Sequence, residues 1–190
     1  MRSRSFLTTA AILTLVAGAA CDSPTTTSED TTAAEQPVAI QVEVGEQLAR
    51  LPSNVQRDVA ALRAATSPLH NLDRAIAAGF AVDLTGCLEN PPIGGMGHHY
   101  GMVSRIDGAP PVVTEPEILV FSPKRNGKLQ LGAVEYIIPY EAWVPAQPPE
   151  LFGQTFHRND GAGLWVLHVW LWNHNPDGLF ADWNPTVSCP

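Results

Sequence analysis

The chain has 190 residues, of which 11 are basic and 19 are acidic, and its net charge is −8. An acidic chain without a cluster of Lys and Arg lacks the charge pattern of nucleic-acid binding, so nucleic acid is not an expected partner. Its 17 prolines and 15 glycines indicate a loop-rich fold with much β-structure and argue against a helical bundle.

The first 20 residues have the pattern of a secretory leader. Arg2 and Arg4 precede an apolar stretch at residues 6–16, and small residues follow up to Cys21. The stretch is too short to span a bilayer comfortably, so we expect residues 1–20 to be a signal peptide that is removed. Removal takes away two basic residues and no acidic one, so the net charge falls from −8 to −10.

Cys21 directly after this leader resembles the lipidated cysteine of bacterial lipoproteins, although Gly18 stands where Leu is usual. We therefore expect lipidation of Cys21 and attachment to a membrane of the bacterial cell envelope through that lipid. An acidic protein surface is repelled by anionic lipids, so the surface itself is not an expected anchor. The alternative is ordinary cleavage before a spare thiol, which would give a soluble periplasmic or secreted protein.

The three cysteines cannot all pair within one chain. If Cys21 carries lipid, Cys87 and Cys189 remain as a pair in an oxidising compartment. We expect them to form a disulfide that ties the chain end to the segment before the first core strand, the alternative being two free buried thiols. No CxxC spacing is present, which argues against a cysteine zinc site.

Residues 21–37 are polar and rich in Thr, which predicts a disordered tether before a single globular domain at residues 38–190. Two helices are expected at the start of this domain. The first begins with a capping box of Ser53 and Gln56, and one face then carries apolar residues: Val55, Val59 and Leu62. The second begins at Ser67-Pro68 and ends before Gly79, with one side formed by Leu69, Leu72, Ile76 and Phe80.

From Gly94 onward the pattern is typical of strands. Residues 117–123 and 128–139 flank Asn126-Gly127, a strong hairpin signal. Residues 140–163 read as a long surface excursion, and residues 164–172 as a nearly unbroken apolar strand. We expect an α+β fold in which two N-terminal helices pack on a mostly antiparallel sheet that approaches a barrel.

Polar side chains interrupt two apolar strand faces. Glu135 shares a face with Leu129, Leu131, Ala133 and Ile137. His168 shares a face with Leu164, Val166, Trp170 and Trp172. Burying such groups costs several kcal/mol unless each is paired, so each needs a partner.

The tandem His98-His99 supplies the third candidate, because only one of two successive strand residues can point to the face of Glu135 and His168. Two imidazoles and a carboxylate on strands suit Fe(II), Mn(II) or Zn(II) with open coordination positions. The predicted ligands are His99, Glu135 and His168, with His98 and His157 as further candidates. Gly94, Gly95 and Gly97 would let the backbone approach closely.

Two other interpretations remain open. The same residues could form a hydrogen-bonded Glu–His pair inside a barrel, completed by Tyr100 or Tyr136. Core packing is the better explanation for the aromatic residues near the C-terminus. If instead they are exposed, around Trp183 and residues 140–163, they would form a surface that recognises a ligand or a protein partner. The rival function is thus a non-catalytic ligand-binding or protein-interaction module. No G-x-S-x-G elbow, P-loop or Rossmann fingerprint is present, which argues against the common hydrolase and nucleotide-binding classes.

A set of segments resembles a group of secreted bacterial proteins and lipoproteins that share a G-x-M-G-x-H-Y segment. The matching stretches are Gly95-Met96-Gly97-His98-His99-Tyr100, Val134-Glu135-Tyr136, residues 149–154, residues 167–172 and residues 184–189. The resemblance favours His99 over His98 as the motif histidine, and it implies no particular activity. The sequence therefore predicts a cell-envelope lipoprotein with a His/Glu site for a divalent metal or a small molecule. If the protein is an enzyme, the metal would activate water or dioxygen, with Glu135 as ligand or general base.

Overall fold

The computed structural model describes residues 36–190, so the predicted signal peptide, the lipidation site at Cys21 and most of the predicted tether lie outside the described residues. The helical elements are α1 (Gln36–Ala49), α2 (Ser53–Thr66), α3 (Leu72–Ala77) and three short 3-10 turns at Ser67–Leu69, Val103–Arg105 and Tyr140–Ala142. The strands are β1 (Val82–Asn90), β2 (Gly94–Gly101), β3 (Ile118–Pro123), β4 (Leu129–Pro139), β5 (Glu150–Leu151), β6 (Gln154–Thr155), β7 (His157–Asn159) and β8 (Leu164–Val169).

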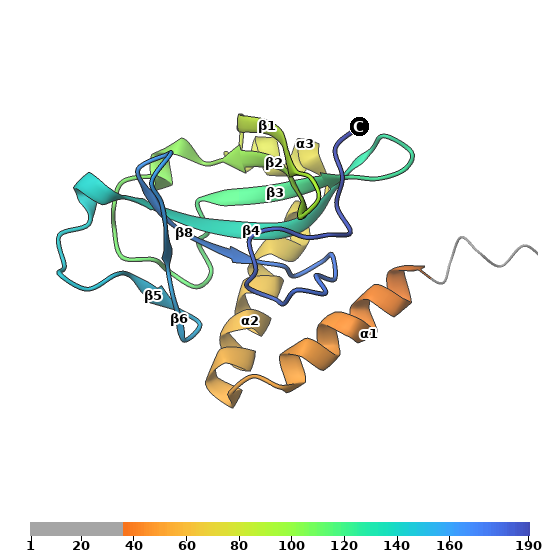
Figure 1. The fold of residues 1–190 in the computed structure, drawn as a ribbon, viewed down its shortest axis with the longest axis horizontal. Helices are drawn as coiled ribbons and strands as arrows, with labels where there is room; N and C mark the ends of the chain where they lie inside the picture. The colour runs from red at the N-terminus through yellow and green to blue at the C-terminus, as the bar shows by residue number, and fades with distance from the viewer. Residues whose placement is uncertain (1–35) are drawn as a thin grey trace, which may run out of the picture. The chain divides into compact units, whose positions relative to one another are not determined.

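Six strands form one curled antiparallel sheet in the order β1-β2-β3-β4-β8-β7, and β5 pairs with β6 in a small separate hairpin. This arrangement confirms the predicted α+β class (Figure 1). Among residues 36–190, no helix is long and apolar enough to cross a bilayer.

Three α-helices precede the sheet within the described residues, where the sequence predicted two. Helix α1 overlaps the end of the predicted tether. It was missed because residues 36–49 contain Gly45 and several β-branched residues, which are weak helix formers. Tertiary contacts compensate for this: Val44 is fully buried, and the Gln47 side chain donates a 2.7 Å hydrogen bond to the Asn175 carbonyl.

Helix α2 buries Val55, Val59 and Leu62 as predicted. The prediction of a capping box at Ser53 is wrong, because the N-cap of the helix is Pro52, one residue earlier. The Pro52 carbonyl accepts the Gln56 amide at 3.0 Å, and the Gln56 side chain donates to the Leu51 carbonyl at 2.8 Å.

The second predicted helix is split at residues 70–71. Asn71 starts α3 as a new N-cap, with its side chain accepting from the Arg74 amide at 3.0 Å. The break changes the helical phase, so Ala75 is buried whereas Ile76 is 40% exposed. Gly79 follows the helix end as predicted, with a positive φ of 110°.

The β3–β4 hairpin confirms the Asn126-Gly127 prediction, with Gly127 at φ 74°. Further along, the pairing shifts by one residue, because Val120 pairs with Ala133 whereas Phe121 pairs with Leu131. Gly132 is therefore a bulge. It moves Leu131 to the opposite face, so the prediction that Leu131 shares the face of Glu135 is wrong.

Strand β8 ends at Val169, three residues earlier than predicted. Beyond it, the Trp170 amide donates to the Leu179 carbonyl at 2.8 Å, and the Trp172 amide donates to the Gly132 carbonyl at 2.9 Å. The chain has left the ladder by this point. Trp172 consequently packs with the residues under the helices, not on the face of His168.

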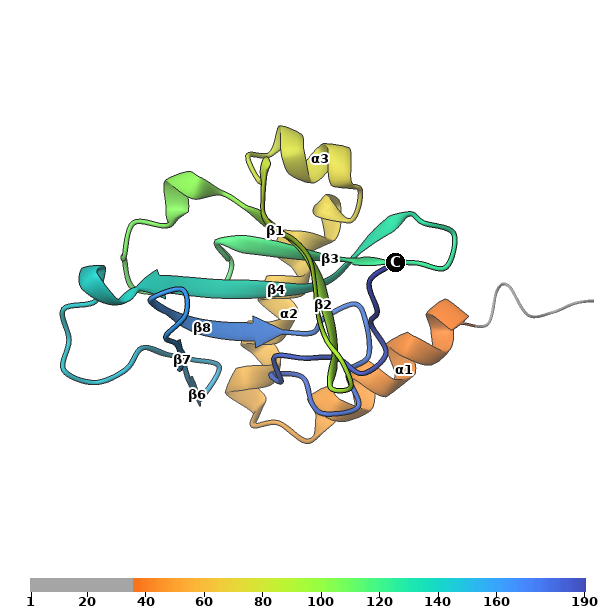
Figure 2. The same cartoon turned by 45° about the horizontal axis from the view of Figure 1, so that its top comes forward.

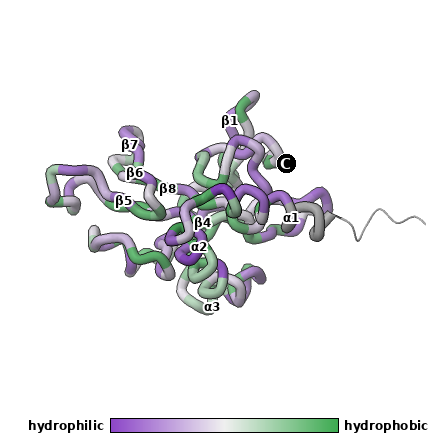
Figure 3. Tube along the Cα trace, turned by 90° about the horizontal axis from the view of Figure 1, so that it is seen from below, coloured by the Kyte–Doolittle hydropathy of each residue, from purple (hydrophilic) through white to green (hydrophobic). Residues whose placement is uncertain are grey.

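The two sheet faces bury separate apolar clusters. The helix-side cluster includes Val59, Leu119, Phe121, Tyr136, Ile138 and Leu167. The cluster on the opposite face, which faces the cavity described below and is called the cavity-side cluster, consists of Ile118, Val120, Ala133, Ile137, Val166, Trp170 and Val187. Helices α2 and α3 lie on one side of β4, and β1 and the chain end lie on the other (Figures 2 and 3).

Strand β1 was not predicted, because its side chains are half-buried or exposed at an edge of the sheet and give no clear apolar signal.

The predicted disulfide is confirmed between Cys87 and Cys189. Cys87 lies inside β1, however, and not before the first strand. Part of the predicted 140–163 surface excursion is likewise a strand, since β7 pairs with β8 at the other edge.

The C-terminal segment, residues 175–189, docks on β2 through backbone groups. The Gly95 amide donates to the Asn184 carbonyl at 3.1 Å, and the Asn184 amide donates back to the Gly95 carbonyl at 3.0 Å. A Cβ atom on Gly94 would lie 2.4 Å from the Asn184 carbonyl oxygen, and one on Gly95 would lie 2.8 Å from the Val187 carbonyl oxygen. The glycines therefore permit a close backbone approach, as predicted.

We predict that Gly95→Ala lowers the free energy of unfolding by about 1–3 kcal/mol, because the added methyl overpacks a backbone contact that cannot give way easily. Urea unfolding followed by tryptophan fluorescence measures the change. Gly161→Ala is the control: its Cβ would meet no atom closer than 3.6 Å, and its effect should stay within about 0.5 kcal/mol. Equal effects of the two substitutions would contradict the close-approach argument.

Candidate metal centre

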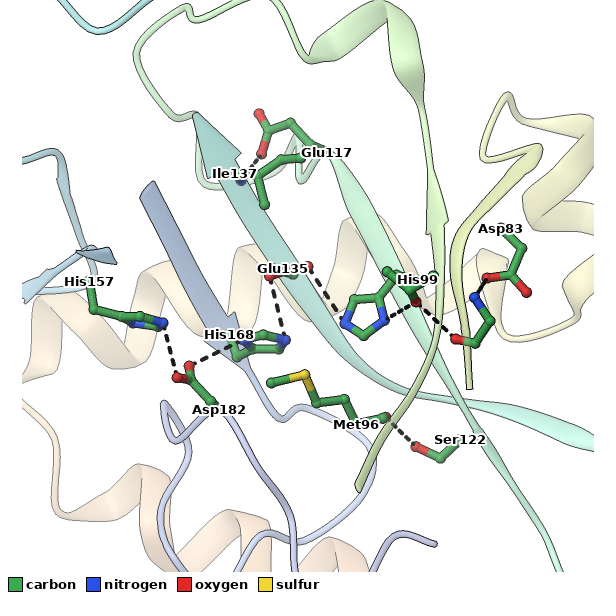
Figure 4. Close-up of polar contacts among 12 residues, drawn as sticks. Asp83, Met96, His99, Glu117, Ser122, Glu135, Ile137, His157, His168 and Asp182 are labelled. Carbon is green, nitrogen blue, oxygen red and sulfur yellow. Dashed lines mark hydrogen bonds and ion pairs between the residues drawn. The ribbon is translucent and has the colours of Figure 1, made fainter. Parts of the chain in front are cut away.

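The curled sheet brings His99, Glu135 and His168 together on the face opposite the helices. His99 lies on β2, and Glu135 and His168 are register partners on β4 and β8. Glu135 Oε2 lies 3.7 Å from His99 Nε2, and Glu135 Oε1 lies 3.7 Å from His168 Nε2. One ligand atom from each residue lies within 4.8 Å of the other two, and we call these residues the His–Glu–His cluster (Figure 4).

The cluster is buried, with 3% of His99, 7% of Glu135 and 1% of His168 exposed. Contacts of 3.7 Å are longer than hydrogen bonds. His168 Nε2 is buried without a hydrogen-bond partner, and His168 Nδ1 has only a 3.4 Å contact with Asp182 Oδ1, which is unusual for polar atoms in a protein interior. The geometry thus leaves room for a shared cation, and Tyr136 does not complete a hydrogen-bonded Glu–His pair because its hydroxyl donates to the Val113 carbonyl.

Thr85 orients the His99 ring. The Thr85 hydroxyl donates its hydrogen to the Gly86 carbonyl at 2.8 Å, and its oxygen lies 3.0 Å from His99 Nδ1. With that hydrogen on the Gly86 carbonyl, the Thr85 oxygen accepts from Nδ1–H of His99. This tautomer leaves the lone pair of Nε2 directed at Glu135, as a metal ligand requires.

Asp182 holds the corresponding position behind His168. Its Oδ1 lies 3.4 Å from His168 Nδ1, and its Oδ2 lies 3.0 Å from His157 Nε2. Sequence reasoning missed both Thr85 and Asp182. Asp182 lies in an irregular segment, where no periodicity assigns a side chain to a face, and Thr85 lies on the edge strand that was not predicted.

The structure does not bring the two further candidates into the cluster. His98 points to the other side of β2, where its Nδ1 lies 2.8 Å from Asp83 Oδ2. His157 reaches the cluster only through Asp182.

The charges around His168 favour a cation at this position. Burial alone would lower the pKa of His168, but the carboxylates of Glu135 and Asp182 outweigh it and hold that pKa above its ordinary value. Burial lowers the pKa of His99, against the opposing effect of Glu135. Burial would raise the pKa of Asp182, but His157 and His168 hold that pKa well below its usual range. A proton or a metal ion would satisfy the negative charge beside His168.

A cavity of about 500 Å³ lies in front of the cluster. All three cluster residues line it, together with Thr85 and Leu88 from β1, residues 157–159 of β7, and Asp182 and Trp183 from the C-terminal segment. The cavity is within the size range of small-molecule sites, and the His–Glu–His cluster forms part of its wall.

Glu117 is a second buried carboxylate, and it lies apart from the cluster near Ile137 (Figure 4). Glu117 is 7% exposed, and its Oε2 accepts a hydrogen bond from the Ile137 amide at 3.2 Å. Burial raises the pKa of Glu117 to about 7, against the smaller effect of that hydrogen bond.

Comparison of the chain with protein families, with curated proteins and with solved structures finds no match.

We predict that Glu117 makes the protein less stable as the pH rises from about 4.5 to 7. The folded state keeps a proton on Glu117 over this range, whereas the unfolded chain has released it, so stability is present at the lower pH and lost at the higher. The shift to about 7 corresponds to at most about 3 kcal/mol. Glu117→Gln keeps an acceptor for the Ile137 amide without the charge, and it should be more stable than the parent at pH 8.

Urea unfolding at pH 5 and pH 8 measures this effect. Glu115→Gln, at an exposed position of the same segment, is the control and should follow the parent. If Glu117→Gln shows the same pH dependence as the parent, Glu117 is not the source of the loss.

Proposed function

We propose that the domain binds a divalent metal ion through His99, Glu135 and His168, in a site that also admits a small molecule. The observation that carries the proposal is the meeting of three buried ligand atoms within 4.8 Å of one another. Imidazole nitrogens with one carboxylate suit Fe(II), Mn(II) or Zn(II) and leave coordination positions open. A metal of this class would polarise a bound oxygen and activate water, and Fe(II) or Mn(II), which unlike Zn(II) are redox-active, would also suit dioxygen.

The surrounding residues have roles that support the same proposal. Thr85 and Asp182 orient the two imidazoles from behind, as hydrogen-bonding partners of metal-bound histidines commonly do. The Glu135 carboxylate faces both imidazoles, and any oxygen it leaves uncoordinated would serve as a general base toward a molecule in the cavity.

We also propose an extracytoplasmic location, with Cys21 lipidated and the domain held at a membrane of the cell envelope. The leader pattern before Cys21 supports export. The Cys87–Cys189 disulfide supports an oxidising compartment.

We predict near-stoichiometric iron, manganese or zinc in the purified protein and none in the His99→Ala/His168→Ala double variant, because the variant keeps only one ligand. Elemental analysis by mass spectrometry measures the content. His98→Ala is the matched control, since it removes the adjacent histidine from the opposite side of β2, and it should retain the metal.

A chelator should also lower the thermal midpoint of the parent protein, because a ligand that binds only the folded state adds stability, about 2.7 kcal/mol at 100 times its Kd. Absence of metal from the parent, and no gain in stability on adding Mn(II), Fe(II) or Zn(II), would refute the metal site. That result would favour the alternative, a binding module that uses the aromatic surface around Trp183 and residues 140–163.

We predict that Asp182→Asn weakens metal affinity about 10- to 100-fold without removing a ligand, because the substituted side chain no longer offers a carboxylate to His168 Nδ1. Titration with Co(II), followed by its visible absorption, measures the affinity. Asp177→Asn, an exposed position in the same segment, is the control. Identical affinities for the two variants would show that Asp182 does not support His168.

A further inference from the structure

The cavity in front of the cluster has a polar end and apolar walls. The polar end is the His–Glu–His cluster with Asp182 beside it. The remaining walls are mostly aliphatic: Leu84, Leu88, Met96, Ile118, Ile137, Leu164 and Val166. Such walls favour the apolar part of a ligand, and the polar residues of the lining outside the cluster, Thr85 and residues 157–160, lie at the two strand edges.

The charge at the polar end favours an anionic ligand group. A divalent ion held by one carboxylate and two neutral imidazoles keeps a net charge of about +1. The Asp182 carboxylate lies 3.0 Å from His157 and 3.4 Å from His168, so its negative charge is shared between these two imidazoles and lies outside the metal's own ligands. An octahedral ion with three protein ligands leaves room for two oxygen donors of one ligand.

The rim contributes little free charge. Arg158 and Asp160 line the cavity, but they pair with each other at 2.8 Å, and Arg158 also lies over the Tyr140 ring, 4.4 Å from its centroid. The charge of a bound ligand is therefore selected mainly by the metal at the polar end of the cavity.

The cavity is reached between the two edges of the sheet. Strands β1 and β7 are the two edge strands, and both contribute lining residues. Leu84 on β1 is 41% exposed, and the His157 side chain on β7 is 43% exposed. A ligand entering between them passes Leu84 on one side and the polar residues 157–160 on the other, with the His–Glu–His cluster also in the lining.

We infer that the site takes a small amphipathic molecule with an aliphatic or aromatic body and a monoanionic head that offers two oxygen atoms. This inference rests on the proposed metal site and adds the class of ligand. The head would bind the metal held by His99, Glu135 and His168, and the body would lie along Leu88, Ile137 and Val166.

Octanohydroxamate and acetohydroxamate test the inference, because they share a two-oxygen anionic head and differ only in the length of the alkyl body. Each is titrated into the Co(II)-loaded full chain, and binding is followed by the visible absorption of cobalt. We expect octanohydroxamate to bind about 100-fold more tightly, since its longer chain leaves water for the aliphatic walls. Octanamide, with the same body and a neutral head, should bind more weakly than octanohydroxamate.

A wall variant locates the binding. Leu88→Asp puts a charge on a half-buried wall position of β1 and should abolish the preference for octanohydroxamate while leaving acetohydroxamate affinity unchanged. Val144→Asp, at a position that is 92% exposed and outside the cavity lining, should keep the preference.

The outcomes separate the two proposals. If cobalt binds but the two hydroxamates bind equally, or Leu88→Asp keeps the preference, the apolar-body inference is overturned and the metal site stands. If octanamide binds as tightly as octanohydroxamate, the inference that the site selects an anionic head is overturned. If cobalt does not bind, the proposed function fails, and the ligand inference fails with it.

Discussion

The close approach of the C-terminal segment to β2 is the contact on which the site depends. Gly94 and Gly95 leave room for the backbone at Asn184 and Val187, and the reciprocal Gly95–Asn184 hydrogen bonds fix the register. This contact lays Val187 on the cavity-side cluster and brings Asp182 behind His168. The Cys87–Cys189 disulfide then ties the end of the same segment to β1. A side chain at Gly95 would therefore disturb the cavity without touching any proposed ligand.

The polar cluster explains why such support is needed. Three ionisable side chains are removed from water, which is costly unless each finds a partner, and Asp182 beside them is half-buried. Thr85 satisfies one nitrogen of His99 and Asp182 contacts His168 Nδ1 at 3.4 Å, but His168 Nε2 has no hydrogen-bond partner. A cation between the 3.7 Å contacts would compensate both imidazoles and Glu135 at once. The apolar burial in the helix-side cluster contributes free energy of folding that offsets the cost of burying polar groups on the opposite face of the sheet.

Much of this arrangement was predictable from local patterns, and the misses have physical causes. Strands β4 and β8 are covered on both faces, so they read as apolar runs in which Glu135 and His168 stand out, and the alternation of side chains in β2 separates His99 from His98. Register was harder, because a bulge at Gly132 leaves no clear mark in sequence and reverses the side of Leu131. Asp182 and Thr85 could not be found, since one lies on an irregular segment and the other on an exposed edge whose pairing is set by distant contacts.

The order of strands explains why an open cavity forms at all. A closed barrel would pair its first and last strands and fill its interior with side chains. Here the two edges, β1 and β7, are not paired with each other, and the C-terminal segment covers only part of the concave face. The cavity is lined by an aliphatic group, including Leu88, Ile137 and Val166, and by the polar residues 157–160 near the β7 edge, so the same incomplete closure creates both the entrance and the apolar part of the walls. The curl of the sheet thus links the position of the proposed ligands to the kind of molecule that can reach them.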